Sequence, residues 1–301
     1  MCAGDLSVEV APELGGSVAA FRKRGNESLV DLMRPLSEAA RRNRDPKGAA
    51  MFPMLPYANR IANNRFEFEG RSHEFVPNAC GQRFNLHGTG WTSAWHVVAV
   101  SADAAQLTLD HLEAGDPYAY SAYQRFELTS DRLRVELGVV NRGSHAMPFG
   151  IGLHPWWPRY SDVKLRFYAT RFWLEGPDHL PTESISIPPE LDFSPTRSLP
   201  ETWRNNCYSG WDGFAEILFP SLQVGMRIHA DSNFGHLMLY SDPAGSVFCL
   251  EPQTHASGAL NRLDRECAED LGLAILRPEE SIIGVVSFTP FQLEHHENHP
   301  D

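Results

Sequence analysis

Residues 124–137, with the sequence QRFELTSDRLRVEL, indicate the fold class of this chain. Apolar side chains alternate with polar ones along residues 124–128 and again along residues 132–137, and the polar segment Thr129-Ser130-Asp131 separates the two runs. Successive side chains of a β-strand point to opposite faces of a sheet, so this alternation is typical of half-buried strands. Two such runs joined by a short polar turn predict an antiparallel hairpin.

The same signals recur along most of the chain. Alternation at residues 66–69 and 106–110 predicts further half-buried strands, and the turn at residues 69–71 predicts a second hairpin. More strands are expected at residues 163–168, 214–219, 224–229, 236–240, 247–250 and 282–288. The strongest helical segment, residues 37–44, is short, which leaves a βαβ fold without a place for its helices. We therefore expect an all-β protein, a large antiparallel β-sandwich.

No linker, internal repeat or low-complexity segment divides the chain before its last residues. Sandwiches of this length often form one unit, so we expect a single domain over residues 1–301. The tail at about residues 294–301 contains the histidine-rich sequence HHENH. Such a sequence can bind a metal ion, but its place at the chain end and the lack of an HExxH spacing favour a disordered tail.

The acidic composition excludes some classes of partner. The chain has 26 Lys and Arg against 38 Asp and Glu, a formal net charge of −12, whereas nucleic-acid-binding proteins present a basic face. No apolar segment is long enough to cross a membrane and no export signal is visible, so we expect a cytoplasmic protein. Five scattered cysteines without a CxxC pair fit a reducing compartment and form no recognisable metal-ligand set. The substrate is expected to be small or neutral.

His154 lies in the stretch IGLHPWW, residues 151–157. The glycines Gly150 and Gly152 permit close backbone approach, and Pro155 favours an extended conformation at His154. Trp156 offers a flat face of the kind on which sugar rings stack. An arbitrary histidine is more often a hydrogen-bonded core residue, but these neighbours favour a side chain that transfers protons.

Glu251 follows the run SVFCL, residues 246–250, which is apolar on both faces and is therefore expected to be a central strand that stops at Pro252. Burial raises the pKa of a carboxyl group toward neutrality, as a general acid or base requires. A strand-end glutamate that faces water is an equally good interpretation of these residues alone.

Three further residues are candidates for binding. Arg60, in PYANRI (residues 56–61), can donate two hydrogen bonds to sugar hydroxyls or form a structural ion pair. His87 precedes a glycine in NLHG (residues 85–88), and Asp212 lies between aromatics in WDGF (residues 211–214). An aromatic wall with a carboxylate beside it recurs in sugar-binding sites.

The motifs PYANRI, NLHG, GLHPWW, WDGF and LEPQT occur in an order and spacing that resembles the aldose 1-epimerase (galactose mutarotase) family. The resemblance extends from Leu6 to Phe288. It implies one large β-sandwich with an open cleft that binds a free aldohexose and interconverts its α and β anomers without cofactor or metal. The partner is then a monosaccharide, and no oligomeric state follows.

The resemblance also implies roles for the candidate residues. Glu251 corresponds to the base that takes a proton from the C1 hydroxyl, and His154 corresponds to the acid that protonates the ring oxygen. Arg60, His87 and Asp212 correspond to residues that position the sugar. Family members often have Tyr or Phe followed by Asn after the His-Pro pair, whereas this chain has Trp156-Trp157, so the wall at Trp156 is expected to suit a different sugar.

Three other functions fit parts of the sequence. A hexose-6-phosphate epimerase of the same superfamily would need at least two cations around the phosphate. A glycoside hydrolase would need two carboxylates, for which Asp212 and Glu251 are candidates. A non-catalytic sugar-binding or regulatory module would keep the aromatic wall and Arg60 without needing His154 and Glu251.

Overall fold

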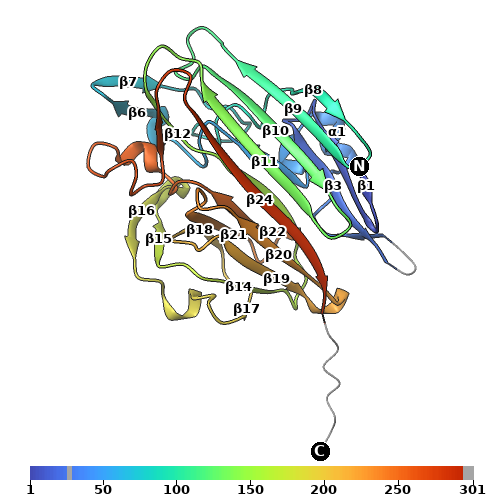
Figure 1. Cartoon of the computed structure of the whole chain (residues 1–301). Helices are drawn as coiled ribbons and strands as arrows, with labels where there is room; N and C mark the ends of the chain where they lie inside the picture. Colours follow the sequence, from blue (N-terminus) through green and yellow to red (C-terminus); the bar gives the residue numbers. More distant parts are fainter. Residues whose placement is uncertain (26–28, 294–301) are drawn as a thin grey trace, which may run out of the picture.

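The computed structural model describes residues 1–25 and 29–293 of the chain, so the predicted disordered tail lies outside the described residues. Within that part, nearly all regular structure is β, and every strand pair is antiparallel, as the alternating sequence predicts. Two large sheets pack face to face (Figure 1). The expectation of an antiparallel β-sandwich is confirmed.

The described part of the first sheet contains eleven strands. Its order is β1 (Cys2–Ala3), β2 (Leu6–Ala11), β3 (Ser17–Arg24), β5 (Met51–Met54), β13 (Gly152–Pro158), β22 (Val247–Gln253), β21 (His236–Ser241), β18 (Arg204–Ser209), β15 (Arg171–Glu175) and β16 (Pro181–Ile185), with β4 (Leu29–Asp31) paired to β3.

The second sheet contains nine strands in the described residues, and the long β24 crosses its middle (Figure 1). Its order is β17 (Arg197–Ser198), β14 (Lys164–Phe167), β19 (Phe214–Phe219), β20 (Val224–Ala230), β24 (Ser281–Gln292), β11 (Leu133–Asn141), β10 (Tyr120–Leu128), β9 (Ala104–His111) and β8 (His96–Val100). Two small two-stranded sheets stand apart: the hairpin of β6 (Arg65–Phe68) with β7 (Arg71–Glu74), and the pair of β12 (Met147–Phe149) with β23 (Ala274–Leu276), which are distant in the sequence.

The segment 124–137 forms the hairpin β10–β11. Leu128 pairs with Leu133 across the turn, and the apolar side chains of residues 126–137 are buried, whereas the charged side chains that alternate with them along each strand are partly exposed. On the outer face Arg134 makes ion pairs with Glu127 (3.3 Å) and Glu136 (2.8 Å). Alternation therefore set both the strand type and the buried face.

The core lies between the two sheets. Leu153 and Trp157 of β13 point into it, and the ring centroids of Trp157 and Phe288 on β24 lie 6.0 Å apart. Because side chains alternate along a strand, His154 and Trp156 of the same strand lie on the opposite face of the first sheet. That face carries the site described below.

Helical structure in the described residues is short. The predicted helix is α1 (Glu38–Asn43), and the hydroxyl of Ser37 accepts a hydrogen bond from the Ala40 amide at its N-terminus (3.1 Å). The 3₁₀ turns are η1 (Pro46–Gly48), η2 (Ala62–Asn64), η3 (Pro177–His179), η4 (Pro189–Leu191), η5 (Pro220–Leu222) and η6 (Ala259–Arg262). Among the described residues, none of these helices has the length and apolar character needed to cross a membrane.

Candidate active site

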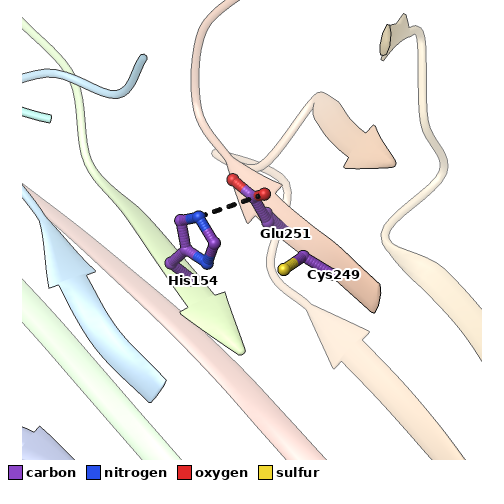
Figure 2. A group of neighbouring side chains, drawn as sticks. All are labelled: His154, Cys249 and Glu251. Carbon is purple, nitrogen blue, oxygen red and sulfur yellow. Dashed lines mark ion pairs between the residues drawn. The ribbon is translucent and has the colours of Figure 1, made fainter. Parts of the chain in front are cut away.

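The neighbouring strands β13 and β22 bring His154 and Glu251 together. Gly152 pairs with Gln253 and Trp156 with Cys249, and this common register places His154 opposite Glu251 on the same face of the sheet. The Nε2 atom of His154 lies 3.3 Å from Oε1 of Glu251, and both side chains are buried (Figure 2). The two residues, 97 positions apart in the chain, therefore form one acid–base pair.

The expectation that Pro252 ends its strand is wrong. β22 continues to Gln253, and Pro252 pairs with Leu237 of β21. Peptide groups of successive residues in a strand face alternate neighbours, so a proline removes a hydrogen bond on one side only. For Pro252 that side faces β13. The pairing of β13 with β22 is interrupted there, between the pair Gly152 with Gln253 and the pair Trp156 with Cys249, and Pro155 of β13 lies in the same interruption. The acid–base pair lies at this interruption.

Burial controls the protonation of the pair. It lowers the pKa of His154 to about 3, with a smaller contribution from the positive charges of Arg34 and Arg60. Burial raises the pKa of Glu251 to about 8, and Arg60 opposes that rise. At neutral pH the pair therefore holds one proton in total, and the unliganded site favours neutral imidazole beside a protonated carboxyl group.

Aromatic side chains fix the imidazole of His154. Its ring centroid lies 4.4 Å from that of Phe52 and 4.9 Å from that of Trp156, with a 24° angle to the indole plane. Trp156 in turn contacts Tyr240 (5.9 Å between centroids), and Tyr240 contacts Trp203 (5.2 Å). Together these rings form a continuous aromatic wall that runs away from the acid–base pair.

Two loops hold Arg60 and His87 at the cleft. Arg60 pairs with Leu86, and the amide of His87 donates to the carbonyl of Asn59 (2.9 Å). The amide of Asn59 donates to Nδ1 of His87 (2.9 Å). Burial holds the pKa of His87 well below its usual value, so the ring is neutral and its proton is on Nε2. His87 can therefore donate one hydrogen bond to a sugar oxygen.

Close packing explains the glycine beside the His-Pro motif. A Cβ atom added to Gly150 would lie 1.9 Å from the ring of His255, which is fully buried. His255 accepts a hydrogen bond from the Ala58 amide through Nε2 (2.9 Å). It therefore fixes the loop that carries Arg60, and it does not line the cleft.

The cleft has a volume of about 300 Å³, within the usual range for small-molecule sites. His154, Glu251, Arg60, His87 and Trp156 all line it, so five of the six predicted site residues meet in one place.

Asp212 is the exception. Its side chain is exposed, and its carboxylate accepts a hydrogen bond from the amide of Phe214 (3.0 Å), two residues later in the same turn. It is not among the residues that line the cleft. An aspartate in a tight turn commonly accepts this local hydrogen bond. The turn therefore explains why an aspartate stands between the aromatic residues of WDGF. We therefore remove Asp212 from the candidate site.

Sequence reasoning missed the far wall of the cleft. Glu175 accepts hydrogen bonds from Trp203 and Asn205 (each 2.8 Å) and contacts Nδ1 of His179 (2.6 Å). All three of its partners line the cleft, and so does Lys47. These residues come from separate loops and strands, and only their tertiary arrangement brings them together, so no local motif marks them.

The described residues contain one cluster of possible metal ligands, and it overlaps this site. One ligand atom each from His154, Cys249 and Glu251 lies within 4.8 Å of the others (Figure 2). Burial raises the pKa of Cys249 well above its usual value, so the sulfur is a neutral thiol in the absence of a cation.

A β-sandwich whose cleft combines an aromatic wall, hydrogen-bond donors and one buried carboxyl–imidazole pair has the features expected of a sugar-binding site that can transfer protons. Comparison with known families agrees with this interpretation: the profile of the aldose 1-epimerase family matches residues 2–268. The chain belongs to the aldose 1-epimerase family, and the resemblance found in the sequence is confirmed.

Known relatives share both sequence and fold. The Escherichia coli (strain K12) protein YphB is 33% identical over 294 residues, which cover 94% of this chain and 95% of YphB. A crystal structure of a putative aldose 1-epimerase from E. coli K12 has a TM-score of 0.88 at 32% identity and covers 97% of this chain and 98% of that one. A galactose mutarotase-like protein from Clostridium acetobutylicum shares the fold, with a TM-score of 0.83 at 21% identity over 97% of this chain and 94% of that one.

Proposed function

We propose that this protein is an aldose 1-epimerase that interconverts the α and β anomers of a free aldohexose of the glucose or galactose type. A base removes the proton of the C1 hydroxyl (O1), the bond between C1 and the ring oxygen O5 breaks, and an acid protonates O5. The open-chain aldehyde then rotates about the C1–C2 bond and closes on its other face. No group is oxidised or reduced.

One observation carries the proposal: the 3.3 Å contact between His154 Nε2 and Glu251 Oε1 at the cleft. O1 and O5 are bonded to the same carbon, so the two proton transfers take place side by side. A base and an acid in direct contact can therefore each reach one of these oxygens. A pair separated by a whole pyranose ring would not.

The proposed cycle uses both arrangements of the shared proton. Glu251 acts as the base and His154 as the acid during opening, which requires the proton to be on His154 when the sugar is bound. Opening leaves the proton on Glu251 and a neutral His154, the arrangement that burial favours. Closing reverses both transfers. Arg60 favours the carboxylate form of Glu251 and thereby assists the opening step.

A phosphorylated hexose is the second candidate substrate. Lys47 and Arg60 both line the cleft, and the side chains of both are free of ion pairs with described carboxylates. Two cations are what capture of a sugar phosphate requires. Measuring anomer exchange of glucose 6-phosphate beside glucose and galactose decides between the two substrates.

The two other functions have less support. Among the described residues that line the cleft, Glu251 is the only carboxylate, whereas glycoside hydrolysis normally uses two. A binding module without catalysis has no use for a buried proton-sharing pair, whose burial is unfavourable for both charged forms. Release of nitrophenol from a nitrophenyl glycoside, or sugar binding without anomer exchange, would favour these functions instead.

Polarimetry of freshly dissolved α-glucose and α-galactose tests the proposal. We expect the wild-type protein to accelerate the approach to anomeric equilibrium, and His154→Ala and Glu251→Gln to lose on the order of 100- to 10,000-fold in rate, the usual contribution of a positioned acid or base. Asp212→Asn is the matched control, because Asp212 lies outside the cleft. Full activity in either cleft variant would contradict the role of that residue.

A further inference from the structure

Cys249 has no role in the proposed reaction, yet it lies beside the acid–base pair. It precedes Glu251 by two residues on β22, so both side chains lie on the same face of the sheet. It is opposite Trp156 in the pairing of β13 with β22. In Figure 2 the sulfur of Cys249 and the carboxylate of Glu251 lie on the same side of the imidazole ring.

The geometry approaches that of a metal site with three protein ligands. One ligand atom each from His154, Cys249 and Glu251 lies within 4.8 Å of the other two, and all three side chains are buried. In a zinc site, bonds of about 2.0–2.3 Å to nitrogen, oxygen and sulfur hold the ligand atoms somewhat closer together than this. Side-chain movements on the order of 1 Å would suffice, because such ligand distances are set by the ion.

An independent observation points to the same cluster. Nδ1 of His154 is buried and makes no hydrogen bond to another residue, although the side chain as a whole is 10% exposed. Buried polar atoms are almost always paired, so an unpartnered nitrogen calls for an explanation. Nε2 is engaged by Glu251, whereas Nδ1 makes no hydrogen bond to another residue. In the tautomer with its proton on Nε2, His154 can therefore offer the Nδ1 lone pair to a cation without breaking a hydrogen bond to a neighbouring residue.

We propose that His154, Cys249 and Glu251 bind a soft divalent cation, Zn²⁺ or Cd²⁺, and that its binding blocks proton transfer at the candidate active site. Mixed nitrogen, sulfur and oxygen ligands suit these ions. Three protein ligands leave a fourth position, which water from the cleft can fill. The bound cation occupies a lone pair of the Glu251 carboxylate and, bound at Nδ1, keeps the His154 proton on Nε2, so Glu251 can no longer act as the base.

The charge balance permits this exchange. The cation replaces the thiol proton of Cys249 and the carboxyl proton of Glu251, so two protons are released and the net charge of the cluster does not change. The charged groups that face the cluster are Arg34 and Arg60, which act electrostatically on Cys249 and Glu251 respectively. The guanidinium of Arg34 donates hydrogen bonds to the carbonyls of Lys47 and Ala49, and its Cζ atom lies 4.4 Å from the centroid of the Trp156 ring.

Cation binding can be measured without any assay of sugar chemistry. The exposed thiols Cys2, Cys80 and Cys267 are first replaced by serine, which leaves the buried Cys207 and Cys249. Titration with Cd²⁺ is followed through the ultraviolet charge-transfer absorption of a cadmium–thiolate bond, to which the histidines of the tail do not contribute. We expect saturation at one Cd²⁺ per chain.

Matched variants locate the site. Cys249→Ser should abolish the absorption, whereas Cys207→Ser, which removes the other buried thiol, should leave it unchanged. Glu251→Gln, which keeps the side-chain shape, should weaken Cd²⁺ binding at least tenfold. An absorption that persists in Cys249→Ser, or a Cd²⁺ affinity unaffected by Glu251→Gln, would overturn the three-ligand site.

The blocking effect rests on the proposed function and is tested separately. Anomer exchange is measured with and without Zn²⁺, and each variant is compared with its own metal-free rate. Loss of activity that a chelator reverses, and that disappears in Cys249→Ser, would support the block; unchanged or faster exchange on the loaded protein would refute it. If the protein catalyses no anomer exchange at all, the Cd²⁺ titration still decides whether the site exists.

Discussion

Replacement of Glu251 by glutamine should make the fold more stable at alkaline pH. Burial raises the pKa of Glu251 from 4.5 to about 8, so this group favours the folded state only while it is protonated. Its contribution is fully present below pH 4.5 and is lost as the pH rises to 8. At roughly 1.4 kcal/mol for each pH unit, the loss amounts to about 5 kcal/mol.

Glutamine has nearly the same shape as glutamic acid and does not ionise. The free energy of unfolding of Glu251→Gln should therefore equal that of the wild type below pH 4.5 and exceed it by a growing amount above, up to about 5 kcal/mol beyond pH 8. Urea unfolding followed by tryptophan fluorescence at a series of pH values measures this difference. Asp212→Asn, an exposed carboxylate outside the cleft, is the control. Parallel wild-type and Glu251→Gln curves across pH 5–8 would refute the reasoning.

Other changes probe the surroundings of the pair. Arg60→Gln removes the positive charge that lowers the pKa of Glu251, so the alkaline limit of kcat/KM should move to higher pH and turnover should fall. Gly150→Ala places a Cβ atom against the ring of His255 and should lower the free energy of unfolding by about 1–3 kcal/mol, whereas Gly235→Ala, with open space around its Cβ position, should have a much smaller effect. His87→Phe removes the donor at Nε2 and should raise KM for the sugar more than it lowers kcat, as steady-state kinetics would report.

The sequence predicted elements whose period was clear. Residues 124–137 became β10 and β11 with the expected faces, and the run at 214–219 became β19 with the same bounds. The predicted end of β22 at Pro252 was wrong, because a proline removes a backbone hydrogen bond on only one side of a strand. The sequence does not tell which neighbouring strand lies on that side. The order of strands in a sheet brings distant segments together, and no single segment of the sequence predicts that order.

The candidate site followed the same rule. His154, Glu251, Arg60 and His87 were found because their neighbouring residues form short motifs. Asp212 also lies in a short motif, but its carboxylate accepts a hydrogen bond within a local turn and lies outside the cleft. The wall formed around Glu175 depends on contacts between segments that are far apart in the chain, and no spacing in the sequence marks such contacts.

The pH dependence of kcat/KM for anomer exchange tests the central claim, that one proton shared by His154 and Glu251 drives ring opening. In the free protein the pKa is about 3 for His154 and about 8 for Glu251. We therefore expect kcat/KM to be constant through neutral pH and to fall above pH 8, where the pair loses its only proton. A wild-type rate that keeps rising above pH 8 would contradict the claim.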